Sequence, residues 1–170
     1  MTRRDYLHKW FVYTLGLLLV WLLDGHILPH LPVFGTTPML LPLAAVAVAV
    51  LEGAFAGTGF GLAVGLLWEL AYPGGFGGLV LFLALLGMAV GALSQYALAR
   101  SLPGCLLCSA GTLAILSGMR IVRGLLNHSA SFGALLRVAV PEFLLSMVCV
   151  PLIYLLFHSI YDRVGGTKLA

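Results

Sequence analysis

Two cysteines three positions apart, Cys105 and Cys108, form the clearest pair of side chains in this sequence that could bind a metal ion. Their spacing supplies half of a tetrahedral zinc site, which needs four ligands. Neither a second cysteine pair nor a histidine motif nearby completes the set. Both lie in apolar surroundings, where a free thiol behaves as a small hydrophobic side chain. We therefore expect no metal, no cofactor and no disulfide framework.

Motifs for catalysis are also missing from the sequence. It contains no H-E-x-x-H metalloprotease motif, no G-x-S-x-G nucleophile elbow and no G-x-x-x-x-G-K-[ST] phosphate loop. The five histidines lie mostly near the ends of hydrophobic segments, and none has a motif spacing to a candidate nucleophile. We therefore expect no catalytic residues and assign the chain to no enzyme class.

Charged residues within the hydrophobic segments are the remaining candidates for chemistry, because burying a charge in a membrane is costly. Arg120 and Arg123 are three positions apart, so on a helix they share a face. Glu142 follows Pro141, where we expect a helix N-terminus that favours negative charge. We expect Glu142 to form a structural ion pair with Arg120, Arg123 or Arg137, in preference to a substrate site.

Two further acidic residues, Asp24 and Glu52, lie near the ends of hydrophobic segments. At such positions a carboxylate can reach the water at the membrane interface. We expect both side chains to be solvated and assign them no chemistry.

The elements that position these residues are hydrophobic segments. Of the 170 residues, 61% are hydrophobic and only 9% are charged, whereas soluble proteins have roughly 25% charged residues. Most segments approach the ~20 residues that span a bilayer. They predict one integral membrane domain over residues 1–170, an all-α polytopic bundle of about six transmembrane helices. The segments are 10–28, 38–51, 54–71, 78–99, 104–126 and 135–160.

Residues 38–72 cannot form a single membrane-spanning helix. At 1.5 Å per residue such a helix would be about 50 Å long, against a hydrocarbon core of about 30 Å. We expect a break at Glu52 and Gly53, because a charge there stands beside a residue of low helix propensity. If the segment before the break is re-entrant, the chain has five spans and not six.

The distribution of lysine and arginine predicts the orientation. With six spans, one side carries most of these residues, and the loops after the first and third spans carry none. Both termini are therefore expected in the cytoplasm, although Arg120, Arg123 and Arg137 flank a loop on the opposite side. The net charge of +3 does not indicate a nucleic-acid partner, since no polar face is present to form a basic groove. The residues on the cytoplasmic side are Arg3, Arg4, Lys9, Arg100, Arg163 and Lys168.

A series of small residues at intervals of four marks the third segment. Glycines at this spacing let helix backbones approach closely in membranes. We expect the third helix to be central to the bundle and to pack against Gly87 and Gly91 of the fourth segment. The series consists of Gly53, Gly57, Gly61, Gly65 and then Glu69.

The stretch GTGFGLAVGLLWELAYPGGFG, from Gly57 to Gly77, resembles the bacterial rod shape-determining protein MreD family. That family typically combines glycines at this spacing with a phenylalanine and an acidic residue, followed by a short glycine-containing turn. The resemblance covers the whole chain loosely and residues 38–91 more closely. One departure is Glu69, because the family usually has aspartate at this position.

The resemblance implies a fold similar to the substrate-binding S component of energy-coupling-factor vitamin transporters, with six helices. It also implies a scaffold in the inner (cytoplasmic) membrane, in contact with lipid. This scaffold would bind MreC, and through it MreB, RodA and a class B penicillin-binding protein, to control cell shape and lateral peptidoglycan synthesis. Helix packing or partner binding is then expected at Gly57, Phe60, Gly61, Gly65, Glu69, Gly77, Gly87 and Gly91.

The alternative is an S component that captures a vitamin or a similar small molecule. A ligand site of that kind needs a cavity with several convergent polar groups. The sequence offers few besides the arginines near residue 120, Glu69 and Asp24, so the scaffold is the preferred hypothesis.

Overall fold

A computed structural model describes residues 3–27, 38–71, 78–96, 102–126 and 132–164. The all-α fold class is confirmed, since every element in these ranges is helical. Each of the six predicted segments corresponds to a helix, and the predicted break at Glu52 and Gly53 is observed. The helices are α1 (Arg3–Leu22), which continues into a π-helical turn η1 (Leu23–Ile27), α2 (Leu40–Glu52), α3 (Ala54–Ala71), α4 (Gly78–Tyr96), α5 (Leu102–Leu126) and α6 (Phe132–Val164).

Three of the described helices are long and apolar enough to cross a membrane, over Gly78–Gln95, Leu102–Leu126 and Phe132–Arg163. The helix α3 is also apolar but shorter, over Ala54–Leu70. The helix α2, over Leu40–Glu52, is shorter still. At 1.5 Å per residue α2 is about 20 Å long, less than the hydrocarbon core of about 30 Å. The bundle therefore suits a membrane, with α2 too short to cross it unaided.

The centre of the bundle is α2 and not the glycine-bearing helix α3, so that expectation was wrong. Every residue of 40–51 is buried, and α2 packs against α1, α3, α4, α5 and α6. By contrast, α3 leaves Phe55 93% exposed and Leu70 76% exposed. The physical reason is composition, because a helix that is apolar on all sides can be enclosed on all sides.

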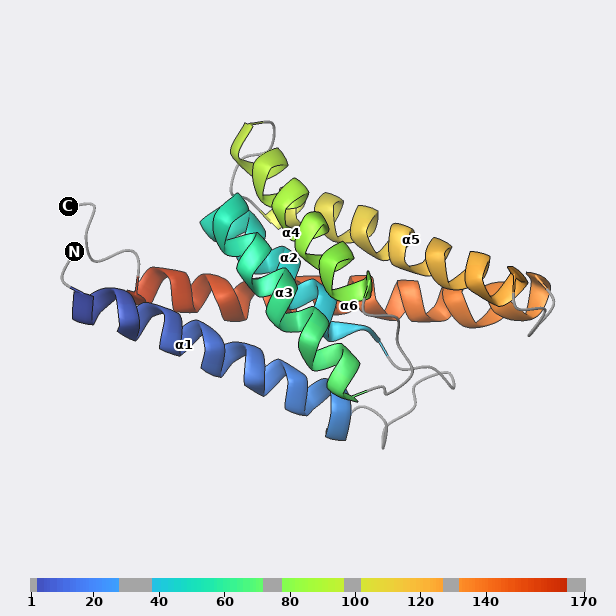
Figure 1. Ribbon diagram of the computed structural model, residues 1–170, viewed down its shortest axis with the longest axis horizontal. Coiled ribbons are helices and arrows are strands. Elements are labelled where there is room, and N and C mark those ends of the chain that lie inside the picture. Colours follow the sequence, from blue (N-terminus) through green and yellow to red (C-terminus); the bar gives the residue numbers. More distant parts are fainter. Residues whose placement is uncertain (1–2, 28–37, 72–77, 97–101, 127–131, 165–170) are drawn as a thin grey trace.

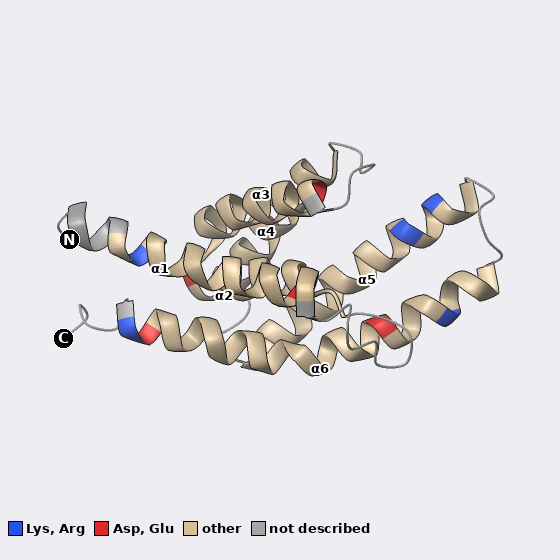
Figure 2. Ribbon diagram, turned by 90° about the horizontal axis from the view of Figure 1, so that it is seen from below, with Lys and Arg blue, Asp and Glu red and all other residues tan. Residues whose placement is uncertain are grey.

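Two antiparallel helix pairs surround α2 (Figure 1). The first is α3 with α4, and the second is α5 with α6. The beginning of α1 and the end of α6 lie at the same end of the molecule in both ribbon views (Figures 1 and 2). Figure 2 shows basic residues at this end and also at the far ends of α5 and α6.

Candidate functional site

The helices α3 and α4 meet through glycines, with no side chain between their backbones. A Cβ atom added to Gly57 would fall on the carbonyl of Gly87, and one added to Gly87 would fall on the carbonyl of Gly57, both well under the 3.0 Å that real Cβ atoms keep. A Cβ on Gly61 would likewise meet the carbonyl of Leu83. These glycines therefore belong to a contact within the chain.

The same contact extends toward both ends of the pair. A Cβ on Gly65 would lie 2.6 Å from Val80 Cα, and one on Gly91 would lie 2.5 Å from Ala54 Cα. The structure thus brings together the two glycine series that the sequence singles out. Contacts of this kind are typical of membrane helices, where small residues allow backbones to approach.

The other predicted residues of this region lie elsewhere. Phe60 faces α1, where its ring centroid is 5.9 Å from that of Trp10 and 5.9 Å from that of Tyr13. Glu69 is partly buried near the end of α3, and its Oε1 makes no hydrogen bond within the described residues. Gly77 lies outside the described residues. Of the residues predicted in this region, the glycines are therefore the ones that lie in the α3–α4 contact.

Gly53 joins α2 to α3 in a backbone conformation that favours glycine. Its φ is +96°, and its N–H donates a hydrogen bond of 2.9 Å to the Ala49 carbonyl. The Gly53 carbonyl in turn accepts from the N–H of Gly57 at 2.9 Å. An L-residue with a side chain rarely adopts this φ, so glycine makes the direct connection possible.

The C-terminal end of α2 is held to α1 by a partly buried ionic cluster. Glu52 accepts a hydrogen bond of 2.9 Å from the Tyr13 hydroxyl and pairs with Lys9 Nζ at 2.6 Å. The Glu52 side chain is only 11% exposed. The expectation that Glu52 is solvated was therefore wrong, because α1 packs against the end of α2 and supplies a cation in place of water.

The N-terminal end of α2 is held by two side chains from other helices. Asp24 Oδ1 accepts a hydrogen bond of 3.0 Å from the Leu40 N–H, and Ser146 Oγ accepts one of 2.9 Å from the Met39 N–H. The first N–H groups of a helix have no partner within it. Asp24 is 8% exposed, so its predicted interfacial solvation was also wrong. It caps a buried helix.

An ion pair connects α5 with α6 near their far ends. Arg120 Nη1 lies 2.5 Å from Glu142 Oε2. Glu142 is 9% exposed, whereas the Arg120 side chain is 45% exposed. The predicted helix N-terminus at Glu142 was wrong, because α6 begins at Phe132 and continues through Pro141. The carboxylate is therefore stabilised by an arginine.

The two other arginines of this region have different surroundings. Arg137 is exposed on α6. Arg123 lines a cavity together with Arg120. Sequence reasoning recognised the shared face of Arg120 and Arg123 and missed the cavity that this face borders.

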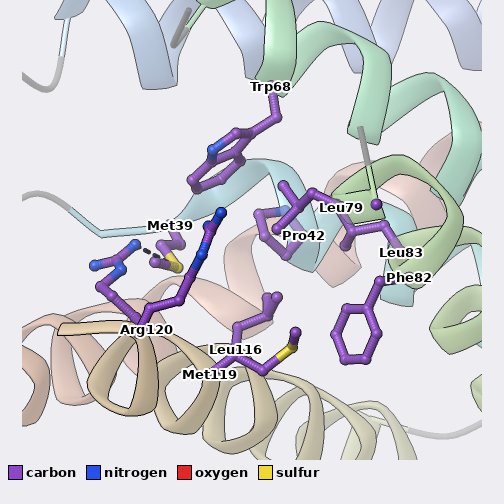
Figure 3. A pocket seen from close by; sticks show the side chains of 11 residues that line it. Met39, Pro42, Trp68, Leu79, Phe82, Leu83, Leu116, Met119 and Arg120 are labelled. Carbon is purple, nitrogen blue, oxygen red and sulfur yellow. Dashed lines mark hydrogen bonds between the residues drawn. The ribbon is translucent and has the colours of Figure 1, made fainter. Parts of the chain in front are cut away.

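The cavity has a volume of about 410 Å³ and lies between α4 and α5. The helices α2 and α3 also contribute to its lining. Figure 3 shows Trp68 on one side and Leu116, Met119 and Arg120 on the other. Its lining comes from four helices, so no short motif could have indicated it. The lining residues are Met39, Pro42, Trp68, Gly78, Leu79, Phe82, Leu83, Leu116, Met119, Arg120 and Arg123.

Potential metal ligands are dispersed over the described residues, where no group of three or more His, Cys, Asp or Glu could hold a metal ion. Cys105 and Cys108 are buried in α5. The Cys105 Sγ is 4.0 Å from the hydroxyl oxygen of Ser109.

A scan against protein-family models and searches of the curated proteins and of the solved structures give no match to this chain. Interpretation of the site therefore depends on the residues and contacts described above.

Proposed function

We propose that this chain is a membrane scaffold resembling MreD, which binds MreC and helps to place lateral peptidoglycan synthesis in the cell-elongation complex. The observation that carries the proposal is the bonding of three carboxylates with little solvent exposure, Asp24, Glu52 and Glu142. Each bonds to a group on another helix. These three carboxylates thus connect helices of the bundle, as a subunit that acts by shape and contact requires.

The partner surface that we propose is the outer side of α3. Phe55, Leu62, Leu66 and Leu70 are all exposed, and their spacing of seven, four and four places them along one side of a helix. The glycine side of α3 is already occupied by α4. An MreC helix would therefore meet the apolar side, and MreB, RodA and a class B penicillin-binding protein would be reached through MreC.

The cavity bears on the alternative of a vitamin-binding S component. Small-molecule sites place several convergent polar groups around the ligand. Most of the lining here is apolar, and its charged groups are Arg120 and Arg123. This lining favours the scaffold over the S component.

Co-purification tests the scaffold. The tagged chain is co-expressed with the MreC-like protein of the same organism and purified in a mild detergent. Wild type should retain MreC in a constant ratio, and Leu66→Trp should lower this ratio about tenfold, as expected for a lost contact worth about 1.4 kcal/mol. Leu85→Trp is the matched control, since Leu85 is similarly exposed on α4.

The two parts of the proposal fail separately. If the wild-type chain retains no MreC, the scaffold function is rejected. If Leu66→Trp and Leu62→Trp retain as much MreC as Leu85→Trp, the outer side of α3 is not the partner surface.

A further inference from the structure

The cavity between α4 and α5 has the volume and lining of a site for a hydrocarbon chain. Its volume of about 410 Å³ falls within the range of about 300–1,000 Å³ typical of ligand sites. Leu79 and Phe82 of α4 face Leu116 and Met119 of α5 across it (Figure 3). Apolar side chains on both walls favour an apolar occupant, because burial of hydrocarbon is favourable.

The charged groups of the cavity lie together on α5. Arg120 and Arg123 are three positions apart, so both side chains lie on the same side of that helix and line the cavity. Arginine binds phosphate with paired, charge-assisted hydrogen bonds. An occupant with a phosphate at one end and a hydrocarbon chain at the other therefore matches the whole lining.

One of the hydrogen bonds of Arg120 goes to a weak acceptor, which a stronger acceptor could replace. Its Nη1 is bound to Glu142, but its Nη2 donates toward the Met39 sulfur at 3.8 Å. A thioether sulfur is a weak acceptor. A phosphate oxygen at this place would replace a weak partner with a strong one and leave the ion pair with Glu142 intact.

The charged side chains that line the cavity select an anionic molecule. Arg120 and Arg123 both line it, whereas Glu142, the partner of Arg120, is not among its lining residues. The lining therefore has an excess of positive charge. A zwitterionic headgroup would bring its own cation to this place, whereas an anionic headgroup would neutralise the excess.

We propose that the cavity between α4 and α5 binds one anionic phospholipid, with an acyl chain between the helices and the phosphate at Arg120 and Arg123. Met119 lines the cavity and is itself exposed, so a chain can enter from the surrounding bilayer. The site is independent of MreC and of the outer side of α3.

Native mass spectrometry of the full-length chain in a nonionic detergent tests the proposal. The protein is titrated with phosphatidylglycerol, with phosphatidylcholine of the same chain length, and with inorganic phosphate. We expect one phosphatidylglycerol per chain, bound about tenfold more tightly than phosphatidylcholine, as expected for one charge-assisted bond worth about 1.5 kcal/mol. Inorganic phosphate should not compete at the same concentration.

Two pairs of variants locate the site. Arg123→Gln should weaken phosphatidylglycerol binding about tenfold, whereas Arg137→Gln, which lies outside the cavity lining, should leave it unchanged. Leu79→Trp should fill the cavity and abolish binding of the acyl chain. Leu81→Trp is its control, because Leu81 is exposed on the same helix.

Each contrary result overturns a stated part of the proposal. Equal binding of phosphatidylcholine and phosphatidylglycerol would exclude selection by the arginines. Competition by inorganic phosphate alone would indicate an anion site without a chain. Equal loss in Arg123→Gln and Arg137→Gln, or in Leu79→Trp and Leu81→Trp, would place the lipid outside this cavity. Co-purification of MreC is a separate measurement, so these results leave the scaffold proposal unaffected.

Discussion

The two antiparallel helix pairs of this protein are held together in different ways. Between α3 and α4 the backbones touch, because glycines such as Gly57 and Gly87 oppose one another. Between the far ends of α5 and α6 the contact is made by side chains, chiefly the ion pair of Arg120 and Glu142. At these glycines the nearest atoms of the facing helix belong to the backbone, which cannot move aside when a group is added. The second pair has flexible side chains, and a cavity borders it.

This difference separates a rigid part of the bundle from an adaptable one. Backbone contacts fix the distance between α3 and α4, which helps to hold the enclosed helix α2 in place. Long side chains at the ends of α5 and α6 can adopt other rotamers, and those of Arg120 and Arg123 border the cavity. Substitutions at matched positions measure how far the two pairs differ.

Gly57→Ala should have the largest effect. The new methyl group would fall on the Gly87 carbonyl, so the two helices must separate, and overpacking of this kind costs about 1–3 kcal/mol. We expect a loss of about 3 kcal/mol in the free energy of unfolding, measured by circular dichroism in detergent micelles. Gly59→Ala is the control, since a Cβ there meets nothing within 4 Å. Equal effects of the two substitutions would contradict the rigid contact.

Arg120→Ala should have the next largest effect. It leaves the buried Glu142 carboxylate without its cation, and breaking a fully buried pair costs about 3–5 kcal/mol. Since the Arg120 side chain is 45% exposed, we expect about 2 kcal/mol in the same measurement. Arg137→Ala, at an exposed position, should change the free energy by less than about 0.5 kcal/mol. A similar loss in both variants would show that the ion pair does not hold α5 to α6.

Ser146→Ala tests whether α6 also holds α2 through a side chain. The substitution removes the acceptor of the Met39 N–H, and leaving such a donor unsatisfied costs about 1–3 kcal/mol. We expect a loss of about 1 kcal/mol, with Ser146→Thr retaining most of the stability through its own hydroxyl. If the threonine variant loses as much as the alanine variant, the hydroxyl is not the stabilising group.

Gly124→Ala should have the smallest effect and gives the sharpest contrast with Gly57→Ala. The atoms nearest to the new methyl group would be those of the Leu135 side chain, at 2.9 Å. That side chain can change its rotamer, and alanine favours the helix by about 1 kcal/mol. We expect a net change within about 0.5 kcal/mol. A loss as large as that of Gly57→Ala would make the α5–α6 pair as rigid as the α3–α4 pair.

Local sequence signals were sufficient for the elements and for the glycine contact. The break at Gly53 follows from a charge beside a glycine, and the spacing of Gly57, Gly61 and Gly65 indicates one packed helix side. The central position of α2 was also visible in principle. Residues 40–51 contain no charged or hydrogen-bonding side chain, which is typical of a helix enclosed on all sides.

Contacts between distant segments could not be predicted in this way. Lys9 and Glu52 are 43 positions apart, and Met39 and Ser146 are 107 positions apart. A carboxylate near a segment end is solvated or buried according to which helix packs against it, and a single sequence does not contain that information. The cavity was missed for the same reason, since four helices contribute to its lining.

The N-terminal end of α2 has a consequence for biosynthesis. Its first backbone donors are satisfied by Asp24, which precedes α2 in the chain, and by Ser146 of the last helix. During translation the serine is made more than a hundred residues after the amide that it serves. A nascent chain that stops before α6 therefore exposes an unmet polar group, a defect that membrane quality control can recognise. The Met39 N–H therefore gains its acceptor only after the last helix has been made.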